Sequence, residues 1–208
     1  MIYRLSQVFF RLVFRLYFRW EIIGAEHLTR VGGGLLVCNH TSFLDPLLAG
    51  TPWPRPIHYL AREDLFGVPI LSGWMRACHT IPVRRGAGSL YSVRRGIEVV
   101  RRGGVVLVFP EGTRSPTGEL QDPRGGVGFL IKMTGAPVYP CYLDGAFEAW
   151  PRHAAFPRPR KIRILYGPPV QLPRDLPPEE LSRRALALVE QLGQPSRGSS
   201  GMAEATSA

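Results

Sequence analysis

Two short polar segments of the sequence contain residue types that could transfer a proton or hold an anion. In residues 39–45, His40 stands five positions before Asp45. A histidine can act as a general base near neutral pH, and a carboxylate that accepts from one ring nitrogen leaves the other nitrogen free to take a proton. A histidine that satisfies local backbone groups, followed by an aspartate that caps a helix before Pro46, would give the same spacing. The segment alone is compatible with both interpretations.

The second segment, residues 109–115, reads FPEGTRS. Glu111 can accept hydrogen bonds from substrate hydroxyls, and Gly112 lets the backbone approach a ligand closely. Arg114 carries a planar donor fork that suits a phosphate group. An ordinary turn in which Glu111 pairs with Arg114 explains this segment equally well when it is taken alone. Backbone N–H groups after His40 or around Gly112 are candidate donors to an oxyanion.

Both segments follow apolar runs that predict buried strands, at residues 35–38 and 105–109. Open α/β sheets bind ligands at the carboxyl ends of their strands, so we expect the two segments to meet at one edge of a sheet.

The remaining pattern predicts one α/β domain over residues 21–193, with a mixed, mostly parallel sheet flanked by helices. Further strands are expected at 58–61, 80–83, 137–143 and 161–166, helices at 64–77, 89–102, 127–134 and 178–192 with Gly193 as the stop, and a disordered tail at 194–208.

Residues 1–20 predict an amphipathic helix that lies in the interface of a membrane. On a helical wheel, Gln7 and the arginines fall within a stripe about 120° wide, and the rest of the surface is apolar and rich in aromatic residues. The arginines of this stripe are Arg4, Arg11, Arg15 and Arg19.

Three other interpretations of residues 1–20 compete with this one. A signal peptide needs an uninterrupted apolar run and a small-residue cleavage site, and the segment has neither. A spanning helix would bury Arg11 at a cost of about 2.5–3.5 kcal/mol, with Arg15 adding to it. An amphipathic helix packed on the core of the domain remains open.

The composition points to an anionic partner. The 208 residues carry a formal net charge of +10, and every basic residue other than Lys132 and Lys161 is an arginine. Such an excess suits a nucleic acid, a phosphorylated substrate or an anionic lipid surface, but no nucleic-acid-binding motif is visible, so nucleic acid is not an expected partner. Three cysteines without a CxxC pair indicate neither a disulfide framework nor a zinc site.

Taken together, the two segments resemble motifs of the glycerolipid acyltransferase family, which includes 1-acylglycerol-3-phosphate acyltransferase. Residues 39–45 resemble its first motif, H-x4-D, and residues 109–115 resemble its third motif residue for residue. Residues 81–85, IPVRR, and residues 136–140, APVYP, are looser matches to its second and fourth motifs. The order and spacing of the motifs cover residues 33–145.

The resemblance implies a role for each matched position. His40 would be the general base and Asp45 its orienting partner. Arg85 with Glu111 and Gly112 would hold the phosphate and glycerol of the acceptor, and Thr113 and Arg114 would shape that pocket. One position departs from the family, because the residue before Arg85 is commonly acidic there. Here it is Arg84, a possible additional phosphate contact that leaves the identity of the acceptor's head group open.

The resemblance therefore implies an O-acyltransferase that uses acyl-CoA or acyl carrier protein and acylates the free hydroxyl of 1-acylglycerol-3-phosphate. The product would be phosphatidic acid, made for phospholipid biosynthesis by a peripheral or monotopic protein on the cytoplasmic face of a membrane.

Neither a metal nor a cofactor is expected, since the thioester is already activated. An acyltransferase for another lysolipid, a transacylase that keeps the His40–Asp45 pair, and a non-catalytic lipid-binding protein remain alternatives. A serine esterase is disfavoured, because G-x-S-x-G is absent.

Overall fold

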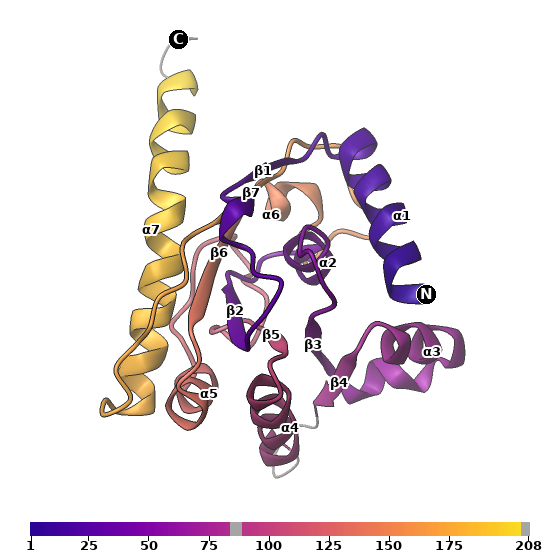
Figure 1. Cartoon of the computed structure of the whole chain (residues 1–208). Helices are drawn as coiled ribbons and strands as arrows, with labels where there is room; N and C mark the ends of the chain where they lie inside the picture. Colours follow the sequence, from indigo (N-terminus) through magenta and orange to yellow (C-terminus); the bar gives the residue numbers. More distant parts are fainter. Residues whose placement is uncertain (84–88, 205–208) are drawn as a thin grey trace.

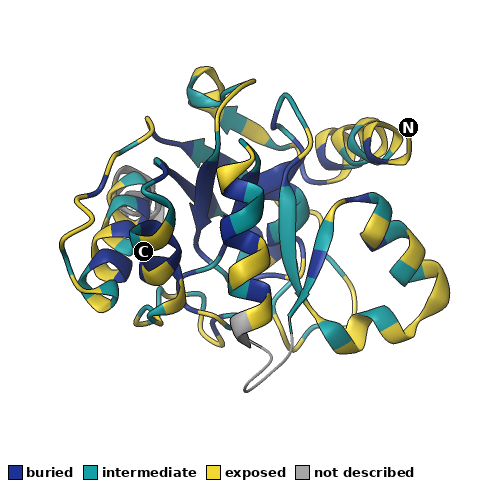
Figure 2. Ribbon diagram, turned by 60° about the horizontal axis from the view of Figure 1, so that its bottom comes forward, coloured by how far each residue is buried: buried dark blue, intermediate teal, exposed yellow. Residues whose placement is uncertain are grey.

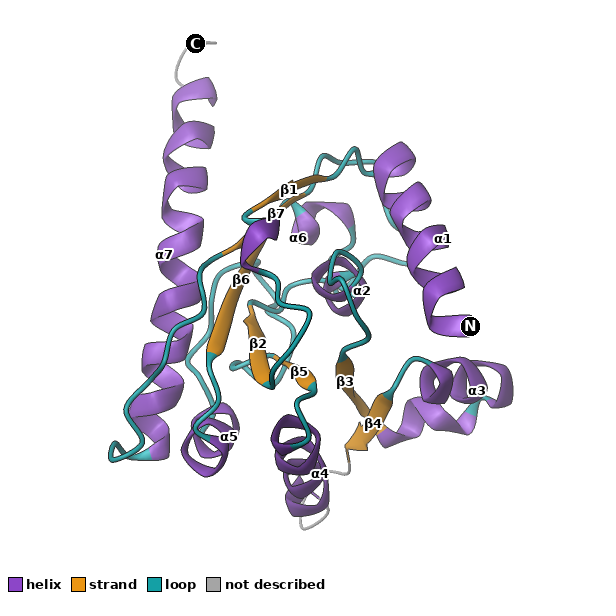
Figure 3. Ribbon diagram, in the orientation of Figure 1, coloured by secondary structure: helices purple, strands orange, loops and turns teal. Residues whose placement is uncertain are grey.

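The computed structural model describes residues 1–83 and 89–204. The strands of these residues form one seven-stranded sheet in the order β1-β7-β6-β2-β5-β3-β4 (Figures 1 and 3). All neighbouring strands run parallel except β6 and β7, which confirms the predicted mixed, mostly parallel sheet. The strands are β1 (Glu21–Ile23), β2 (Gly34–Cys38), β3 (His58–Arg62), β4 (Thr80–Val83), β5 (Val105–Val108), β6 (Val138–Asp144) and β7 (Arg163–Tyr166).

Helices cover both faces of this sheet (Figure 1). One face packs against α4 (Ser89–Arg101), α5 (Gly126–Thr134) and α7 (Pro178–Glu204). The other packs against α1 (Ile2–Tyr17), α2 (Asp45–Gly50) and α6 (Ala146–Ala149). At the β4 edge, a 3-10 helix η2 (Glu63–Gly67) precedes α3 (Pro69–Ala77), which contacts β4 and α1, and a short η1 (Ala25–His27) follows β1.

The central strand β2 shows why the apolar run at 35–38 was informative. Leu36 and Cys38 face the cluster of α1 and α2, whereas Leu35 and Val37 face that of α4, α5 and α7. All residues of β2 are buried, because successive side chains of a strand point to opposite faces and both faces are covered here (Figure 2).

Two predicted helices have different bounds in the structure. The segment expected as one helix at 64–77 is split into η2 and α3, because Pro69 lacks an N–H and its ring favours the first turn of a new helix. The last helix does not stop at Gly193, and its backbone continues to Glu204 through most of the tail expected to be disordered. Gly193 packs against the ring of Tyr142, where a Cβ would approach ring atoms to 2.6 Å, so its role is close packing and not helix termination.

Helix α1 has one face packed against the domain and one face exposed. Its inner face carries Tyr3 and Phe14 into the core, and Gln7 and Arg11 donate side-chain hydrogen bonds to the carbonyl of Thr51. Its outer face is exposed, as Figure 2 shows, and it is apolar. The residues of this outer face are Ile2, Leu5, Val8, Phe9, Leu12 and Leu16.

None of the helices in the described part of the chain has the length and apolar character that crossing a bilayer requires.

Candidate active site

The turn after β2 brings His40 and Asp45 together. The Nδ1 atom of His40 lies 2.8 Å from Oδ2 of Asp45, so the contact predicted from their spacing is present. Oδ2 also accepts the backbone N–H groups of Thr41, at 2.6 Å, and Ser42, at 2.7 Å. Asp45 is fully buried at the start of α2. One carboxylate therefore fixes both the orientation of the imidazole and the path of the turn.

The imidazole of His40 is also held from the side. The ring of Phe109 stacks on it with centroids 3.9 Å apart and planes 16° from parallel. Phe109 follows β5, which is the neighbour of β2, so the two polar segments do meet at one edge of the sheet. Within the described residues, Nε2 of His40 has no hydrogen-bond partner, and the side chain is 18% exposed. This nitrogen is therefore available to a proton donor from outside.

Asn39 anchors the turn to the neighbouring strand β6. Its side-chain amide donates to the carbonyl of Leu143 at 3.0 Å, and its side-chain oxygen accepts the N–H of the same residue at 2.8 Å. Sequence analysis gave Asn39 no role of its own. The available signal was a polar side chain directly after a buried strand, where it needs a partner.

Glu111 occupies a different position from the one expected. Its side chain is 1% exposed, and its carboxylate oxygens accept the backbone N–H groups of His40, at 2.8 Å, and Gln121, at 3.1 Å. We expected it to accept substrate hydroxyls, and in the structure each of its oxygens accepts one backbone N–H. Burial raises the pKa of the Glu111 carboxyl to about 7, with a smaller increase from Asp45, whereas the two N–H donors act in the opposite sense. Glu111 therefore positions the His40 turn.

This raised pKa predicts how Glu111 affects stability. A pKa that rises from 4.5 to about 7 on folding means that the folded protein binds the proton more tightly. Protonation of Glu111 therefore adds about 3 kcal/mol to the free energy of unfolding. This stabilisation is fully present below about pH 4.5 and is lost as the pH rises through about 7. In urea unfolding, the stability difference between wild type and Glu111→Gln should fall by that amount over this range. A difference that does not change with pH would contradict the prediction.

The loop of residues 109–115 is held by its backbone. The N–H of Ser115 donates to the carbonyl of His40 at 2.7 Å. Gly112 has a φ of +67°, and a Cβ there would lie 2.8 Å from Cδ of Arg124, so this position needs glycine. The N–H of Gly112 bonds to the carbonyl of Phe109, and those of Thr41 and Ser42 bond to Asp45. These groups are therefore engaged within the protein, which removes them from the expected oxyanion donors.

Thr113 and Arg114 lie on different sides of this loop. Thr113 lines a polar hollow of about 460 Å³ together with Glu111 and Arg124. The guanidinium of Arg114 lies over the ring of Phe43, with Cζ 3.5 Å from the ring centroid. Phe43 belongs to the His40 turn, so Arg114 is directed toward His40 and Asp45.

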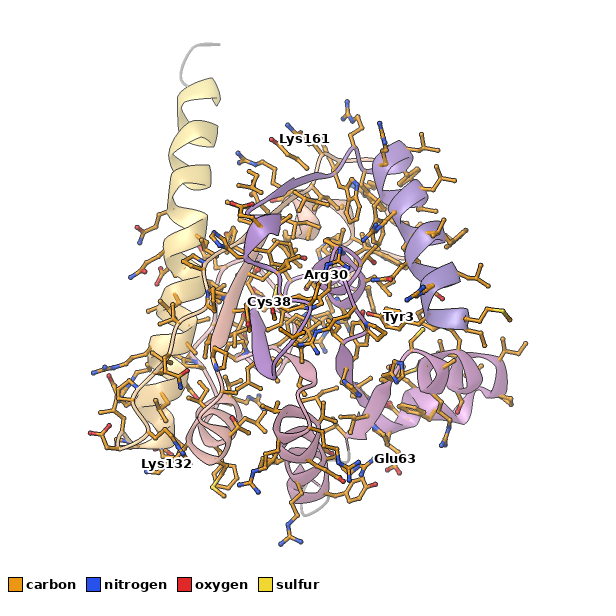
Figure 4. The ribbon with its side chains drawn as sticks, in the orientation of Figure 1. Tyr3, Arg30, Cys38, Glu63, Lys132 and Lys161 are labelled. Atoms are coloured by element: carbon orange, nitrogen blue, oxygen red, sulfur yellow. The ribbon has the colours of Figure 1, made fainter. Side chains whose placement is uncertain are left out.

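An apolar cavity of about 230 Å³ opens beside the His40 turn. Phe43 and Pro46, which lie two positions before and one position after Asp45 in the sequence, line one part of it. Tyr3 and Tyr59 line another part, where their hydroxyl groups lie 3.4 Å apart, and Figure 4 shows Tyr3 on the side of α1 that faces the sheet. The Tyr3 hydroxyl also accepts the N–H of Ile57, just before β3. This part of the cavity therefore lies near the amino-terminal end of β3, whereas His40 follows the carboxyl end of β2.

Sequence analysis missed this cavity. Its walls come from α1, α2, β3, η2 and α3, which are distant in the sequence. The inward aromatic residues of α1 were the available signal, but they equally suited a membrane-bound helix.

Arg84 and Arg85, which were expected to contact phosphate, lie outside the described residues. Within residues 1–83 and 89–204, no group of three or more His, Cys, Asp or Glu side chains is placed to hold a metal ion.

Comparisons with known proteins show which proteins this chain is similar to. The 1-acyl-sn-glycerol-3-phosphate acyltransferase of Bacillus subtilis is 26% identical over 177 residues, which are 84% of each chain. The protein of that name from Limnanthes alba is 29% identical over 155 residues. The matched part is 72% of this chain and 54% of the plant protein. The crystal structure of the 1-acyl-sn-glycerophosphate acyltransferase PlsC from Thermotoga maritima has the same fold, with a TM-score of 0.77 and 21% sequence identity. The matched part is 93% of this chain and 79% of the Thermotoga maritima chain.

The family model described as Acyltransferase matches residues 19–144, which is more than half of the chain. The matched range contains the His40–Asp45 pair, the strand β5 and the whole loop of residues 109–115. The protein therefore belongs to the acyltransferase family.

Proposed function

We propose that this protein transfers a fatty acyl group from acyl-CoA or acyl carrier protein to the free hydroxyl of 1-acylglycerol-3-phosphate, giving phosphatidic acid. The observation that carries the proposal is the His40–Asp45 pair, which belongs to a turn whose Phe43 and Pro46 line an apolar cavity. The names of the relatives from Bacillus subtilis and Limnanthes alba support this acceptor. The reaction would form part of phospholipid biosynthesis.

In this reaction His40 would act as the general base. Its Nε2 takes the proton of the acceptor hydroxyl as that oxygen attacks the thioester carbonyl, and Asp45 stabilises the resulting imidazolium through Nδ1–H. When the tetrahedral intermediate collapses, the C–S bond breaks and the imidazolium returns the proton to the leaving thiolate. General-base help of this kind contributes about 10²–10⁴ in rate. The acyl group passes directly to the acceptor, so no covalent acyl-enzyme is required.

The apolar cavity is the proposed site of an acyl chain of one of the two substrates, most directly that of the donor. Its lining is predominantly apolar, and it begins at Phe43 and Pro46, next to His40. A chain in this cavity would place the carbonyl at its head near Nε2 while the methylene groups lie between α1 and α3.

This assignment predicts a change in chain-length preference when the cavity is shortened. Ala61 of β3 lines the cavity, so Ala61→Phe would fill part of it. Because each methylene in a pocket is worth about tenfold or more, kcat/KM for long-chain donors should fall by at least about tenfold, and that for short-chain donors should change little. Rates with a series of acyl-CoA chain lengths provide the measurement. Equal losses for all lengths would show that the cavity does not hold the donor chain.

We also propose that the outer face of α1 attaches the protein to the cytoplasmic face of a membrane as a peripheral or monotopic protein. Arg4 and Arg15 lie exposed beside the apolar outer face, which suits the anionic lipid surface of that leaflet. An apolar face and a basic edge on one helix are the features expected of an interfacial helix.

The test of the proposed function is an acyl-transfer assay in mixed vesicles. Purified protein is given lysophosphatidic acid together with acyl-CoA, acyl carrier protein loaded with the same chain, or a diacyl phospholipid as donor. Formation of phosphatidic acid from a thioester donor is the expected result, and formation from phospholipid alone would establish a transacylase. If no lysolipid of a panel is acylated by folded, vesicle-bound protein, the proposed function is wrong and a lipid-binding role gains support.

A further inference from the structure

Arg114 is an unpaired cation in the candidate site. Its Nη1 atom is buried and has no hydrogen-bond partner, and no carboxylate in the described part of the chain forms an ion pair with it. Its one close aromatic contact, Phe43, leaves the edge of the guanidinium free to donate. A buried donor without an acceptor costs free energy, so this position favours an acceptor that arrives with a ligand.

The loop after α6 brings a second arginine to the same place. The hydroxyl of Ser42 donates to the carbonyl of Trp150 at 2.8 Å, and Ser42 forms an antiparallel bridge with Pro151. The ring of Trp150 lies 5.3 Å from that of Phe43, the residue on which Arg114 stacks. Arg152 follows Pro151 directly and is exposed. These contacts hold the base of Arg152 beside the His40 turn.

The charges around Arg114 are not balanced within the protein. Burial lowers the pKa of Arg114, and the positive charge of Arg152 is the next largest cause, ahead of Asp45 and Arg62. Arg62 is paired with Asp64, and Asp45 is engaged by His40. Arg152 has no ion pair with any carboxylate that the structure describes. Two guanidinium groups that repel each other, and that form no ion pair with a described carboxylate, suit a doubly charged phosphate, which accepts from two donor forks.

We propose that Arg152 joins Arg114 in binding the phosphate monoester of the acceptor and thereby selects phosphorylated over neutral acceptors. This inference rests on the proposed function, and it adds to that function a residue outside the four motifs. Arg152 would act on binding and not on proton transfer, because Asp45 and Phe109 already fix the imidazole.

The experiment compares acceptors in Arg152→Ala. The KM for lysophosphatidic acid should rise by about tenfold, the loss expected for one charge-assisted donor, while kcat changes little. The KM for a monoacylglycerol, which lacks the phosphate, and the KM for acyl-CoA should stay at the wild-type values. Arg152→Lys should restore part of the loss, since it keeps the charge but not the fork. Arg158→Ala is the matched control, because Arg158 is an exposed arginine of the same loop.

Other results would overturn the proposal. A raised KM for acyl-CoA would assign Arg152 to the phosphates of the donor, and equal losses for both acceptors would indicate a structural role. If wild type acylates nothing, the proposed function fails, but the phosphate site can still be tested by calorimetric titration with a short-chain lysophosphatidic acid. Weaker binding in Arg152→Ala than in Arg158→Ala would support the site, and equal binding in wild type and both variants would refute it.

Discussion

Replacing His40 with alanine should lower the rate of acyl transfer by about 10²–10⁴ while the protein stays folded. The imidazole is the group whose free nitrogen can take the acceptor's proton, and it is held by Asp45 on one edge and Phe109 on one face. Removing it leaves the cavity and the arginines in place, so the loss should appear in kcat more than in either KM. Initial rates with saturating substrates, measured on protein with an unchanged circular dichroism spectrum, provide the test.

Asp45→Asn separates orientation from proton transfer in the same prediction. The amide oxygen can take the place of Oδ2 and accept the same three N–H donors, but the neutral amide cannot stabilise the imidazolium by charge. We therefore expect a severe loss of activity in a folded protein. His27→Ala is the control histidine, because His27 lies in η1, away from the turn. A His40→Ala variant that keeps more than a small fraction of wild-type turnover would rule out the general-base role.

The placement of the candidate site was predictable because it depends on buried strands. The apolar runs before residues 39–45 and 109–115 are long enough to identify β2 and β5, and parallel strands end at the same edge of a sheet. The spacing of His40 and Asp45 left two interpretations open, and the resemblance to the family favoured the paired one. The strand pattern and the family motifs together were therefore sufficient to predict the placement of the site.

The features that sequence reasoning missed depend on distant contacts. The sequence did not indicate that the carboxylate of Glu111 accepts the backbone N–H groups of His40 and Gln121. Arg152 follows Pro151, which pairs with Ser42 from more than a hundred residues away, and nothing in the local sequence indicates this pairing. Gly193 looked like a helix stop, but a ring from β6 packs against it. Tertiary packing overrode the local signal in each case.

The two faces of α1 should respond differently to substitution. On the inner face, Phe14 is 1% exposed and packs against the rings of Phe10, Phe18 and Trp20. Phe14→Ala removes a core side chain and should lower the free energy of unfolding by about 3–5 kcal/mol, or about 10²–10⁴ in the folding equilibrium. Urea unfolding of the protein without membranes measures this loss.

The outer face should control membrane attachment without affecting the fold. Leu5, Leu12 and Leu16 are 61%, 57% and 71% exposed, so changing all three to glutamine removes little packing and keeps a good helix former at each position. If each leucine contributes about 1 kcal/mol in the bilayer, the triple variant should bind anionic vesicles about a hundredfold more weakly. High salt should weaken wild-type binding only in part, because ions screen the arginines but not the apolar face.

Vesicle co-sedimentation and the choice of acceptor together give the decisive measurement. The triple variant should lose activity on acceptor embedded in vesicles, yet keep most of its activity on a short-chain, water-soluble lysophosphatidic acid, since the His40 site is untouched. Phe14→Ala should show the opposite pattern, with lower stability but no change in the affinity of its folded fraction for vesicles. If the triple variant remains attached, or if it unfolds as Phe14→Ala does, the outer face of α1 is not the membrane contact.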